Sequence, residues 1–333
     1  MVEILEKPAQ EQQNLREKLE NVFRNMFEDG CQAVEQLDDQ KFTEHTWTRE
    51  NGVWINGQSS DNTLYIDRAL HQGSVFEKVG VNYVAIEGLL PPGMTFQESG
   101  ALGTSEADQM IDKKGTPFFA TGSSFVIHPR NPMAPTAHAN YRYFQIGDGT
   151  QPEYWWFGGG ADLTPAYLFE EDAVHFHQIH KEVCDKYDQS YYPRFKKNCD
   201  QYFHIAHRGE SRGVGGIFFD HLKGSNLEEL LAFVTDCTKA LVPAYIPLVE
   251  KRKDMPFTEH NKQWQRVVRG RYVEFILTSD RGLRFGLASG MVTPKSVFNC
   301  MPAHAGWEYD DQPAPNSAEA MLREVLKTPR EWV

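Results

Sequence analysis

The hydrophobic positions in the first third of the chain follow a helical period and then give way to polar segments. Over residues 11–38, Leu15, Leu19 and Val22 recur at helical spacing, which predicts an amphipathic N-terminal helix. Residues 48–63 are polar and rich in Gly, Asn and Ser, and residues 91–116 begin with two prolines and carry several glycines. Both segments are therefore predicted to be loops.

Strand patterns dominate the middle of the chain. Apolar segments rich in aromatic and β-branched residues occupy 123–129, 137–146 and 154–163. The turn sequence Gly-Asp-Gly-Thr fills residues 147–150, between the last two segments. An Asp-Gly step in this position is typical of an antiparallel hairpin, so we expect 137–146 to pair with 154–163.

The second half of the chain contains segments with helical spacing and segments with the alternating pattern of strands. Helical spacing predicts helices at 170–187, 193–207 and 317–328. Asn226 and Glu229 form a capping box that opens a further helix, which Pro243 and Pro247 bend or end. Alternating apolar residues predict strands at 215–222, 272–279, 283–289 and 296–302, with a turn at 280–282.

Hairpins mixed with helices, without a regular strand–helix alternation, predict an α+β fold built on a large antiparallel sheet. A length of 333 residues allows one or two domains. Because no linker composition and no internal repeat divides the sequence, we expect a single domain over residues 1–333.

Composition narrows the possible partners. With 40% hydrophobic residues the chain can bury a sizeable core, which excludes a disordered or fibrous protein. The 34 Lys and Arg against 46 Asp and Glu give a net charge of −12. This acidic balance argues against a nucleic acid or an anionic membrane as partner, but a locally basic cleft can still bind an anionic small molecule.

The sequence carries no export signal. Its N-terminus contains Glu3 and Glu6 and lacks the apolar run of a signal peptide, and it is too acidic for a transit peptide. No apolar stretch reaches the 18 residues of a membrane-spanning helix. Five scattered cysteines without a CxxC pair indicate reduced thiols. We therefore expect a cytoplasmic protein without an integral membrane segment.

Residues 155–165, Trp-Trp-Phe-Gly-Gly-Gly-Ala-Asp-Leu-Thr-Pro, are the most unusual segment. Three consecutive glycines weaken a strand but let a flat ligand approach its backbone, and Asp162 follows directly. A β-bulge with a capping Asp162 is the structural alternative. The segment is not a phosphate-binding loop, because no Lys-Ser/Thr follows it.

Arginines placed among aromatic residues are the second candidate feature. The set comprises Arg142, Arg271, Arg281 and Arg284. Guanidinium groups bind carboxylates through two parallel hydrogen bonds, so several arginines beside a glycine-opened strand suggest a flat ligand bearing carboxylates. For any single arginine, an internal carboxylate such as Glu274 or Asp280 is the slightly more frequent partner.

Other chemistries find little support. His175, His177 and His180 lack a metal-binding spacing, and surface or helix-capping histidines are the commoner explanation, so we expect no metal site. The glycines of 212–220 precede a strand rather than follow one, which argues against a dinucleotide site. No GxSxG elbow is present, which argues against a hydrolase of that type.

At these residues the chain resembles the oxygen-dependent coproporphyrinogen III oxidase family over nearly its whole length, from about residue 42 to 333. The resemblance rests on VFEKVGVN (75–82), HPRNPMAPTAHANYRYF (128–144), WWFGGGADLTP (155–165), EEDAVHFH (170–177), YPRFKKNCDQYF (192–203), HRGESRGVGGIFFD (207–220), RGRYVEF (269–275), DRG (280–282) and PREWV (329–333).

The resemblance implies a flat antiparallel sheet between layers of helices, in a homodimer that needs neither metal nor organic cofactor. It implies that molecular oxygen oxidises two porphyrinogen propionates to vinyl groups. The catalytic residues would be His138, Asp162, Asp280 and Arg281, with His138 as a proton shuttle and Asp162 gathering pyrrole N–H groups. The substrate-binding residues would be Arg142, Arg271, Arg284, Gly158, Gly159, Gly160 and Ser124.

The chain departs from the family pattern at several positions. Ile276 replaces an Asn, the segment 290–298 lacks an Arg and a Glu, and the stretch after Trp47 is altered. These changes leave a second hypothesis open, a paralogue that oxidises a related tetrapyrrole to a hydroxyl or keto product. In that case His304 could bind haem, although an exposed loop histidine is the simpler interpretation. A tetrapyrrole-binding protein without catalysis is the third hypothesis.

Overall fold

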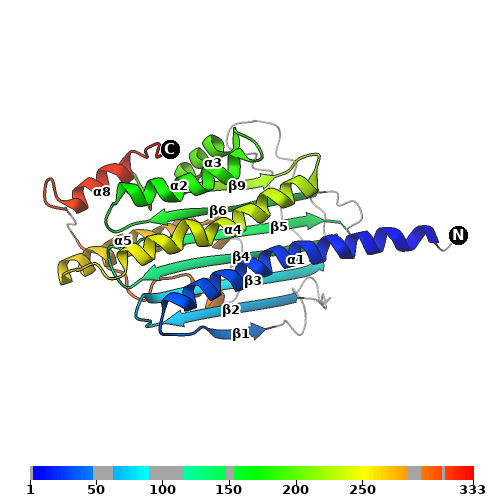
Figure 1. The fold of residues 1–333 in the computed structure, drawn as a ribbon, viewed down its shortest axis with the longest axis horizontal. Coiled ribbons are helices and arrows are strands. Elements are labelled where there is room, and N and C mark those ends of the chain that lie inside the picture. The colour runs from blue at the N-terminus through cyan, green and yellow to red at the C-terminus, as the bar shows by residue number, and fades with distance from the viewer. Residues whose placement is uncertain (1–2, 48–62, 90–115, 148–153, 284–293, 310–311) are drawn as a thin grey trace.

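A single large antiparallel sheet runs through the molecule (Figure 1). The computed structural model describes residues 3–47, 63–89, 116–147, 154–283, 294–309 and 312–333. The strands lie in the order β1 (Thr43–Trp47), β2 (Thr63–His71), β3 (Phe76–Leu89), β4 (Pro117–Pro129), β5 (Thr136–Ile146), β6 (Tyr154–Thr164) and β9 (Gly216–Leu222). Neighbours in this order are antiparallel, so most of the sheet is a simple meander.

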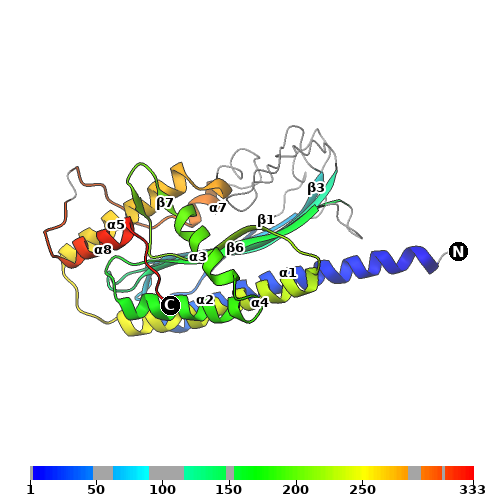
Figure 2. The same ribbon diagram turned by 90° about the horizontal axis from the view of Figure 1, so that it is seen from above.

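Helices cover both faces of the sheet (Figure 2). One face carries α1 (Glu3–Leu37), α2 (Glu170–Asp185) and α4 (Leu227–Arg252), and the other carries α5 (Glu259–Thr278) and α7 (Pro294–Asn299). The remaining described elements are α3 (Tyr191–Tyr202), α8 (Ala318–Lys327) and the short hairpin of β7 (His204–Ile205) and β8 (Glu210–Ser211). The predicted α+β fold, with helices on both faces, is confirmed.

The two faces of the sheet differ in burial. On β5, Tyr141 and Tyr143 are buried in the main hydrophobic core. The alternate residues His138, Asn140 and Arg142 are only half-buried. Since successive side chains of a strand point to opposite faces, one face forms the core and the other is partly open. We call this second face, which carries His138, Asn140 and Arg142, the open face.

Several predicted elements are confirmed. The helix predicted over 11–38 is the larger part of α1, and those over 170–187 and 317–328 are α2 and α8. The strands at 137–146 and 154–163 pair as β5 and β6. The sequence analysis did not assign strands β1 to β3, although β3 contains the quoted segment 75–82 almost entirely.

The strand predicted at 272–279 is wrong, because these residues continue helix α5. The start of α5 explains the difference: Thr258 and Asn261 cap it reciprocally, which favours helix formation from that point. Trp264, Val268 and Tyr272 then lie on the buried side at helical spacing. The alternation of apolar residues after 271 was therefore a coincidental pattern within a helix.

Two further strand predictions fail or fall outside the described residues. Residues 294–299 form helix α7, where Pro294 takes the first helical position that proline tolerates well. Residues 281–283 are helical rather than part of a turn, and the rest of the predicted strand at 283–289 lies outside the described residues. The predicted loops at 48–63 and 91–116 also lie almost entirely outside them.

The helix predicted over 193–207 is too long, because α3 ends at Tyr202 and β7 follows. Helix α4 is capped by the Asn226 side chain as predicted, but it continues through Pro243 and Pro247 to Arg252. Among the described helices α4 alone is long and apolar enough to cross a membrane. Its apolar side chains are buried in the core, which identifies it as a core helix.

Candidate active site

A hydrogen-bonded pair of a histidine and a buried aspartate lies on the open face where β5 and β6 run side by side. His138 and Asp162 are direct partners in the register of the two strands, so their side chains leave the same face. The His138 Nδ1 atom lies 2.8 Å from Asp162 Oδ1. The Asp162 side chain is only 2% exposed, whereas that of His138 is 21% exposed. The imidazole therefore separates the carboxylate from open space.

Arg212 completes this group from the segment before β9. Its Nη2 atom donates to Asp162 Oδ1 at 2.8 Å and to Oδ2 at 3.0 Å, and its Nε atom donates to Oδ2 at 3.2 Å. Both oxygens of the buried carboxylate are thus occupied. The sequence analysis expected Asp162 to accept pyrrole N–H groups directly, and its burial in this structure argues against that contact.

The electrostatics of this group fix a protonation state. Burial alone would raise the pKa of Asp162, but the Arg212 guanidinium and the hydrogen bond from His138 outweigh it and lower that pKa below its ordinary value. Asp162 is then ionised and can only accept hydrogen bonds. The proton between the two residues therefore belongs to His138 Nδ1. Within the described part of the chain, Nε2 of the same ring has no hydrogen-bond partner.

Arg142 lies four residues after His138 along β5, on the same face. Its Nη1 atom donates to Asn140 Oδ1 and its Nη2 atom to Asp220 Oδ1, both at 2.8 Å. The side chain is still 38% exposed, so part of the guanidinium remains accessible. Burial would raise the pKa of Asp220, but Arg142 together with His221 and Arg281 lowers it, so Asp220 is ionised as well.

The end of α5 brings Asp280 and Arg281 to the same region. Tyr202 donates its hydroxyl to Asp280 Oδ2 at 3.2 Å, and the Leu283 backbone N–H donates to Asp280 Oδ1 at 2.6 Å. The Arg281 guanidinium stacks over the Tyr202 ring at 5.0 Å, and its Nη2 atom lies 3.8 Å from Asp220 Oδ2. Asp220 therefore links Arg142 with Arg281, which is 54% exposed.

Ser124 belongs to a polar row that crosses the open face. It pairs in register with Asn82 on β3 and with Asn140 on β5. Its hydroxyl donates to Asn82 Oδ1 at 3.4 Å, and the Asn82 amide donates to Asp67 on β2. The row thus leads from Arg142 and Asn140 towards the β1 edge of the sheet.

The three glycines of β6 occupy different environments. Gly158 is the register partner of Arg142, and a Cβ atom there would lie 2.8 Å from the guanidinium carbon. Gly159 belongs to the core face, where a Cβ atom would meet the Tyr141 ring at 2.4 Å. A Cβ atom on Gly160 would meet the Ile217 carbonyl oxygen of β9 at 2.3 Å. Of the three, only Gly158 leaves room for a candidate site residue.

Of the two other predicted substrate-binding arginines, the structure describes only Arg271, and Arg271 is not part of this group. The Arg271 side chain is 8% exposed and pairs internally with Glu210 at 3.2 Å and with Glu274 at 3.4 Å. Arg271 thus has the internal carboxylate partners of the alternative interpretation. Arg284 lies outside the described residues.

The histidines outside the site also have structural partners. His304 is 68% exposed, and its Nδ1 atom lies 3.5 Å from Glu77. His177 and His180 are fully buried rather than at the surface or in a helix cap. His177 contacts the Tyr192 hydroxyl and the Val214 carbonyl, and His180 contacts the Phe176 carbonyl. Among the residues that the structure describes, no group of three His, Cys, Asp or Glu could hold a metal.

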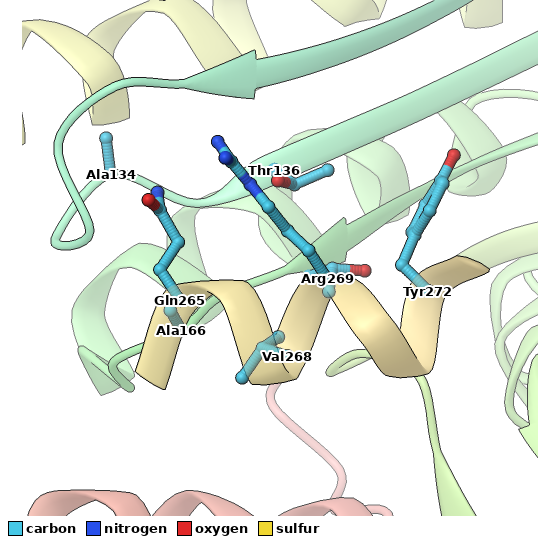
Figure 3. Close-up of a pocket in the computed structure, with 8 residues that line it drawn as sticks. Ala134, Thr136, Ala166, Gln265, Val268, Arg269 and Tyr272 are labelled. Atoms are coloured by element: carbon cyan, nitrogen blue, oxygen red, sulfur yellow. The ribbon is translucent and has the colours of Figure 1, made fainter. Parts of the chain in front are cut away.

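A small cavity lies between α5 and the sheet (Figure 3). Arg269 and Tyr272 rise from α5 on either side of it, and Thr136 lies on the opposite wall. It has room for about one water molecule, so it cannot accept a large planar substrate.

Arg212, Asp220 and Asn82 were not among the site residues predicted from the sequence. Arg212 and Asp220 lie within the quoted segment 207–220, but that segment was judged by its glycines and interpreted as a turn. A lone arginine beside glycines carries no signal that a carboxylate 50 residues earlier needs a partner. Only the antiparallel pairing of β6 with β9 brings the two together.

Comparison with known proteins identifies the family. The family model described as coproporphyrinogen III oxidase matches residues 18–332. The chain is 47% identical to coproporphyrinogen-III oxidase 1, chloroplastic, of Arabidopsis thaliana, over 98% of this chain and 81% of that protein. It is 45% identical to the oxygen-dependent coproporphyrinogen-III oxidase of Drosophila melanogaster, over 97% of this chain and 80% of that protein.

The comparison also corrects one expectation. The similar human protein, 45% identical over 96% of this chain and 68% of its own length, is named mitochondrial, and the Arabidopsis protein is named chloroplastic. The expected cytoplasmic location is therefore wrong. With a matched family model over nearly all of its length and relatives at this level of identity, the chain belongs to the coproporphyrinogen III oxidase family.

Proposed function

We propose that this protein is an oxygen-dependent oxidase that converts propionate side chains of coproporphyrinogen III to vinyl groups. For each propionic acid side chain, one O₂ is reduced to H₂O₂ while the side chain loses CO₂ and two hydrogens and becomes a vinyl group. The porphyrinogen supplies both electrons, so atoms and electrons balance without another reductant. The names of the similar proteins and the family model support this reaction.

One observation in the structure carries the proposal. On a single sheet face, an imidazole held by a buried carboxylate lies four residues along β5 from a partly exposed arginine and its charged neighbours. Arg142 is flanked in the register by Gly122 on β4 and Gly158 on β6, which place no side chain beside it. A flat, electron-rich ring with several carboxylates fits such a face.

The roles of the residues follow from their exposure. His138 is placed to move a proton at Nε2, because Nδ1 is committed to Asp162. Arg142 and Arg281 are the partly exposed cations that would bind substrate carboxylates. Asp280 is a half-buried carboxylate that would accept pyrrole N–H groups beside them. Ser124 would contact the substrate from the neighbouring strand.

We further propose that the reaction needs no metal and no organic cofactor, and that the protein is a homodimer. Both proposals rest on the family, and light scattering of the purified protein tests the second. The alternatives of a hydroxyl- or keto-forming paralogue and of a non-catalytic binding protein have no support in the comparisons. Ile276, one of the departures, lies buried in an apolar cluster with Val126 and Met301.

The test is aerobic incubation of the purified protein with coproporphyrinogen III, with products separated by chromatography and identified by mass. We expect a product that has lost two carboxyl groups, and no product under anaerobic conditions. Arg142→Gln should weaken substrate binding about tenfold or more, because it removes an accessible guanidinium. Arg330→Gln, which removes another half-exposed arginine paired with a single carboxylate, is the control. A product that retains oxygen in the side chain would contradict the proposal.

A further inference from the structure

Arg212 is a buried charge that the proposed chemistry does not use directly. Its side chain is 1% exposed, and it contacts Asp162 rather than open space. Three aromatic rings surround the guanidinium: its central carbon lies 4.0 Å from the centroid of Phe203, 4.5 Å from that of Tyr272 and 4.8 Å from that of Phe275. Such a setting keeps the guanidinium away from water and in one orientation.

The backbone around Arg212 is held as firmly as its side chain. The Arg212 N–H donates to the Phe203 carbonyl at 3.0 Å. Val214 N–H donates to Leu163 O at 2.9 Å, and Leu163 N–H donates to Gly215 O at 3.0 Å. The segment is therefore fastened to the residue directly after Asp162.

Two side chains that are distant in the sequence also hold the segment that follows Arg212. The Val214 carbonyl accepts hydrogen bonds from His177 Nε2 and from Trp332 Nε1, each at 3.1 Å. His177 lies on α2 and Trp332 lies in the C-terminal tail, so a helix and the chain end both support one carbonyl.

An ion pair in this position is costly to build. Burying two charges carries a desolvation penalty that often equals or exceeds their attraction, so a buried pair is weak evidence for stability alone. What the pair does provide is geometry. Asp162 receives three N–H···O contacts from Arg212, which leave its Oδ1 atom aimed at His138 Nδ1.

We propose that Arg212 is a positioning residue of the oxidase reaction, which holds Asp162 ionised and in one orientation so that His138 keeps its proton on Nδ1 and presents Nε2 to the substrate. This role rests on the proposed function. Arg212 would fix the tautomer of His138 indirectly, through Asp162, which contacts both side chains.

The charged and titratable groups around the pair are consistent with this role. Four of them lie on helices or strands and one follows a helix: His138 on β5, Asp162 on β6, Cys199 on α3, Tyr272 on α5 and Asp280 after α5. Burial would lower the pKa of Arg212, but Asp162 raises it above its ordinary value. None of these neighbours is a permanent cation, so the removal of Arg212 leaves burial as the main influence on the pKa of Asp162.

The sign of the expected pH effect follows. Burial raises the pKa of Asp162 and Arg212 lowers it, so Arg212→Gln raises that pKa. A carboxyl that must be ionised for activity then becomes protonated at a higher pH. The acidic limb of the kcat/KM profile therefore moves to higher pH in this variant.

The experiment compares Arg212→Gln and Arg212→Lys with Arg252→Gln. Arg252 is a matched control, because it is also buried, pairs with Asp172 through Nε at 2.8 Å and Nη2 at 2.9 Å, and stacks on Phe169, yet it lies away from the open face. Each variant is assayed for kcat and KM across pH. Side-chain nitrogen NMR of the histidines reports the His138 tautomer without any need for turnover.

We expect Arg212→Gln to lower kcat about ten- to a hundredfold with little change in KM, to move the acidic limb to higher pH and to give mixed His138 tautomers. Arg212→Lys keeps the positive charge but loses the two-point contact with Asp162. Its pH profile should therefore stay closer to that of the wild type than the profile of Arg212→Gln does, while kcat still falls about tenfold. Arg252→Gln should lower only the stability.

Several results would overturn the proposal. One is a wild-type His138 protonated on Nε2 rather than Nδ1. Another is an Arg212→Gln protein that keeps the Nδ1 tautomer, or whose pH profile matches that of Arg252→Gln. An Arg212→Lys protein with wild-type kcat would also overturn it, since charge alone would then suffice. The NMR results decide the point even if coproporphyrinogen III proves not to be the substrate, which separates this failure from a failure of the proposed function.

Discussion

Asp162 is the side chain on which two neighbours depend, since Arg212 and His138 both bond to it. Asp162→Asn removes the charge that pairs with a buried guanidinium and lets the amide donate as well as accept. We expect kcat to fall about a hundredfold or more, because the imidazole loses its fixed tautomer. We also expect a loss of about 3–5 kcal/mol in the free energy of unfolding, because a buried charge is left unpaired.

Turnover and urea unfolding measure the two effects separately. Asp172→Asn is the control, since Asp172 also pairs with a buried arginine, Arg252, but lies away from the open face. It should lower stability without the loss in kcat. A near-normal kcat for Asp162→Asn in folded protein would remove Asp162 from the mechanism.

Of the single residues predicted from the sequence, the structure brings some into the candidate site and not others. Asp162 and Arg142 stand out because a glycine run and an aromatic strand surround them, and both lie on the open face. Arg271 stood out for the same reason, yet its partners are Glu210 and Glu274. A sequence shows that an arginine is embedded among apolar residues, but it does not show which carboxylate the fold brings to it.

Gly158 and Gly159 are adjacent on β6 but belong to opposite faces of the sheet, so we expect different effects when each is replaced by alanine. In Gly158→Ala the new methyl group would lie 2.8 Å from the Arg142 guanidinium, a flexible group that can move aside. In Gly159→Ala it would meet the Tyr141 ring at 2.4 Å inside the core. We expect Gly158→Ala to raise KM about tenfold with little effect on stability, and Gly159→Ala to lower stability by about 1–3 kcal/mol.

Steady-state kinetics and thermal unfolding of both variants check this contrast. A Gly158→Ala protein with wild-type KM would show that the position of Arg142 does not matter for substrate binding. Equal loss of stability in both variants would contradict the assignment of the two glycines to different faces of the sheet.

The elements themselves were predictable where their hydrophobic pattern had only one interpretation. Strands β5 and β6 are long and bounded by a clear turn, and α2 and α8 have regular helical spacing. The region after residue 258 had two interpretations, because Val273, Phe275 and Leu277 alternate as in a strand while Trp264, Val268 and Tyr272 recur as in a helix. The capping pair Thr258 and Asn261 and the packing of α5 decide for the helix.

Over the whole molecule, an acidic protein carries two partly exposed arginines at its candidate site. The net charge is −12, yet two partly exposed cations, Arg142 and Arg281, lie in the same region as His138 on the open face. Their carboxylate partner Asp220 is 21% exposed and ionised. The site therefore offers two accessible guanidinium groups to the carboxylates of a small substrate, while the net negative charge of the protein disfavours a polyanion.

The same arrangement predicts that activity persists after exhaustive chelation. In the proposed reaction the reduced tetrapyrrole gives both electrons to oxygen, so the protein has to position the ring and move protons. The candidate site residues carry imidazole, carboxylate and guanidinium groups that are hydrogen-bonded to one another. Among the described residues, no group of three His, Cys, Asp or Glu could hold a metal ion.

We therefore expect unchanged kcat after treatment with a strong chelator and removal of the chelate by gel filtration, with metal content measured on the same sample. The His177→Gln protein serves as a control for the buried histidines, because His177 bonds to Tyr192 and Val214 and should affect stability rather than metal content. Loss of activity that returns only when iron, another metal or haem is added would contradict the prediction. It would favour the alternative in which a bound metal or haem, rather than the porphyrinogen itself, activates oxygen.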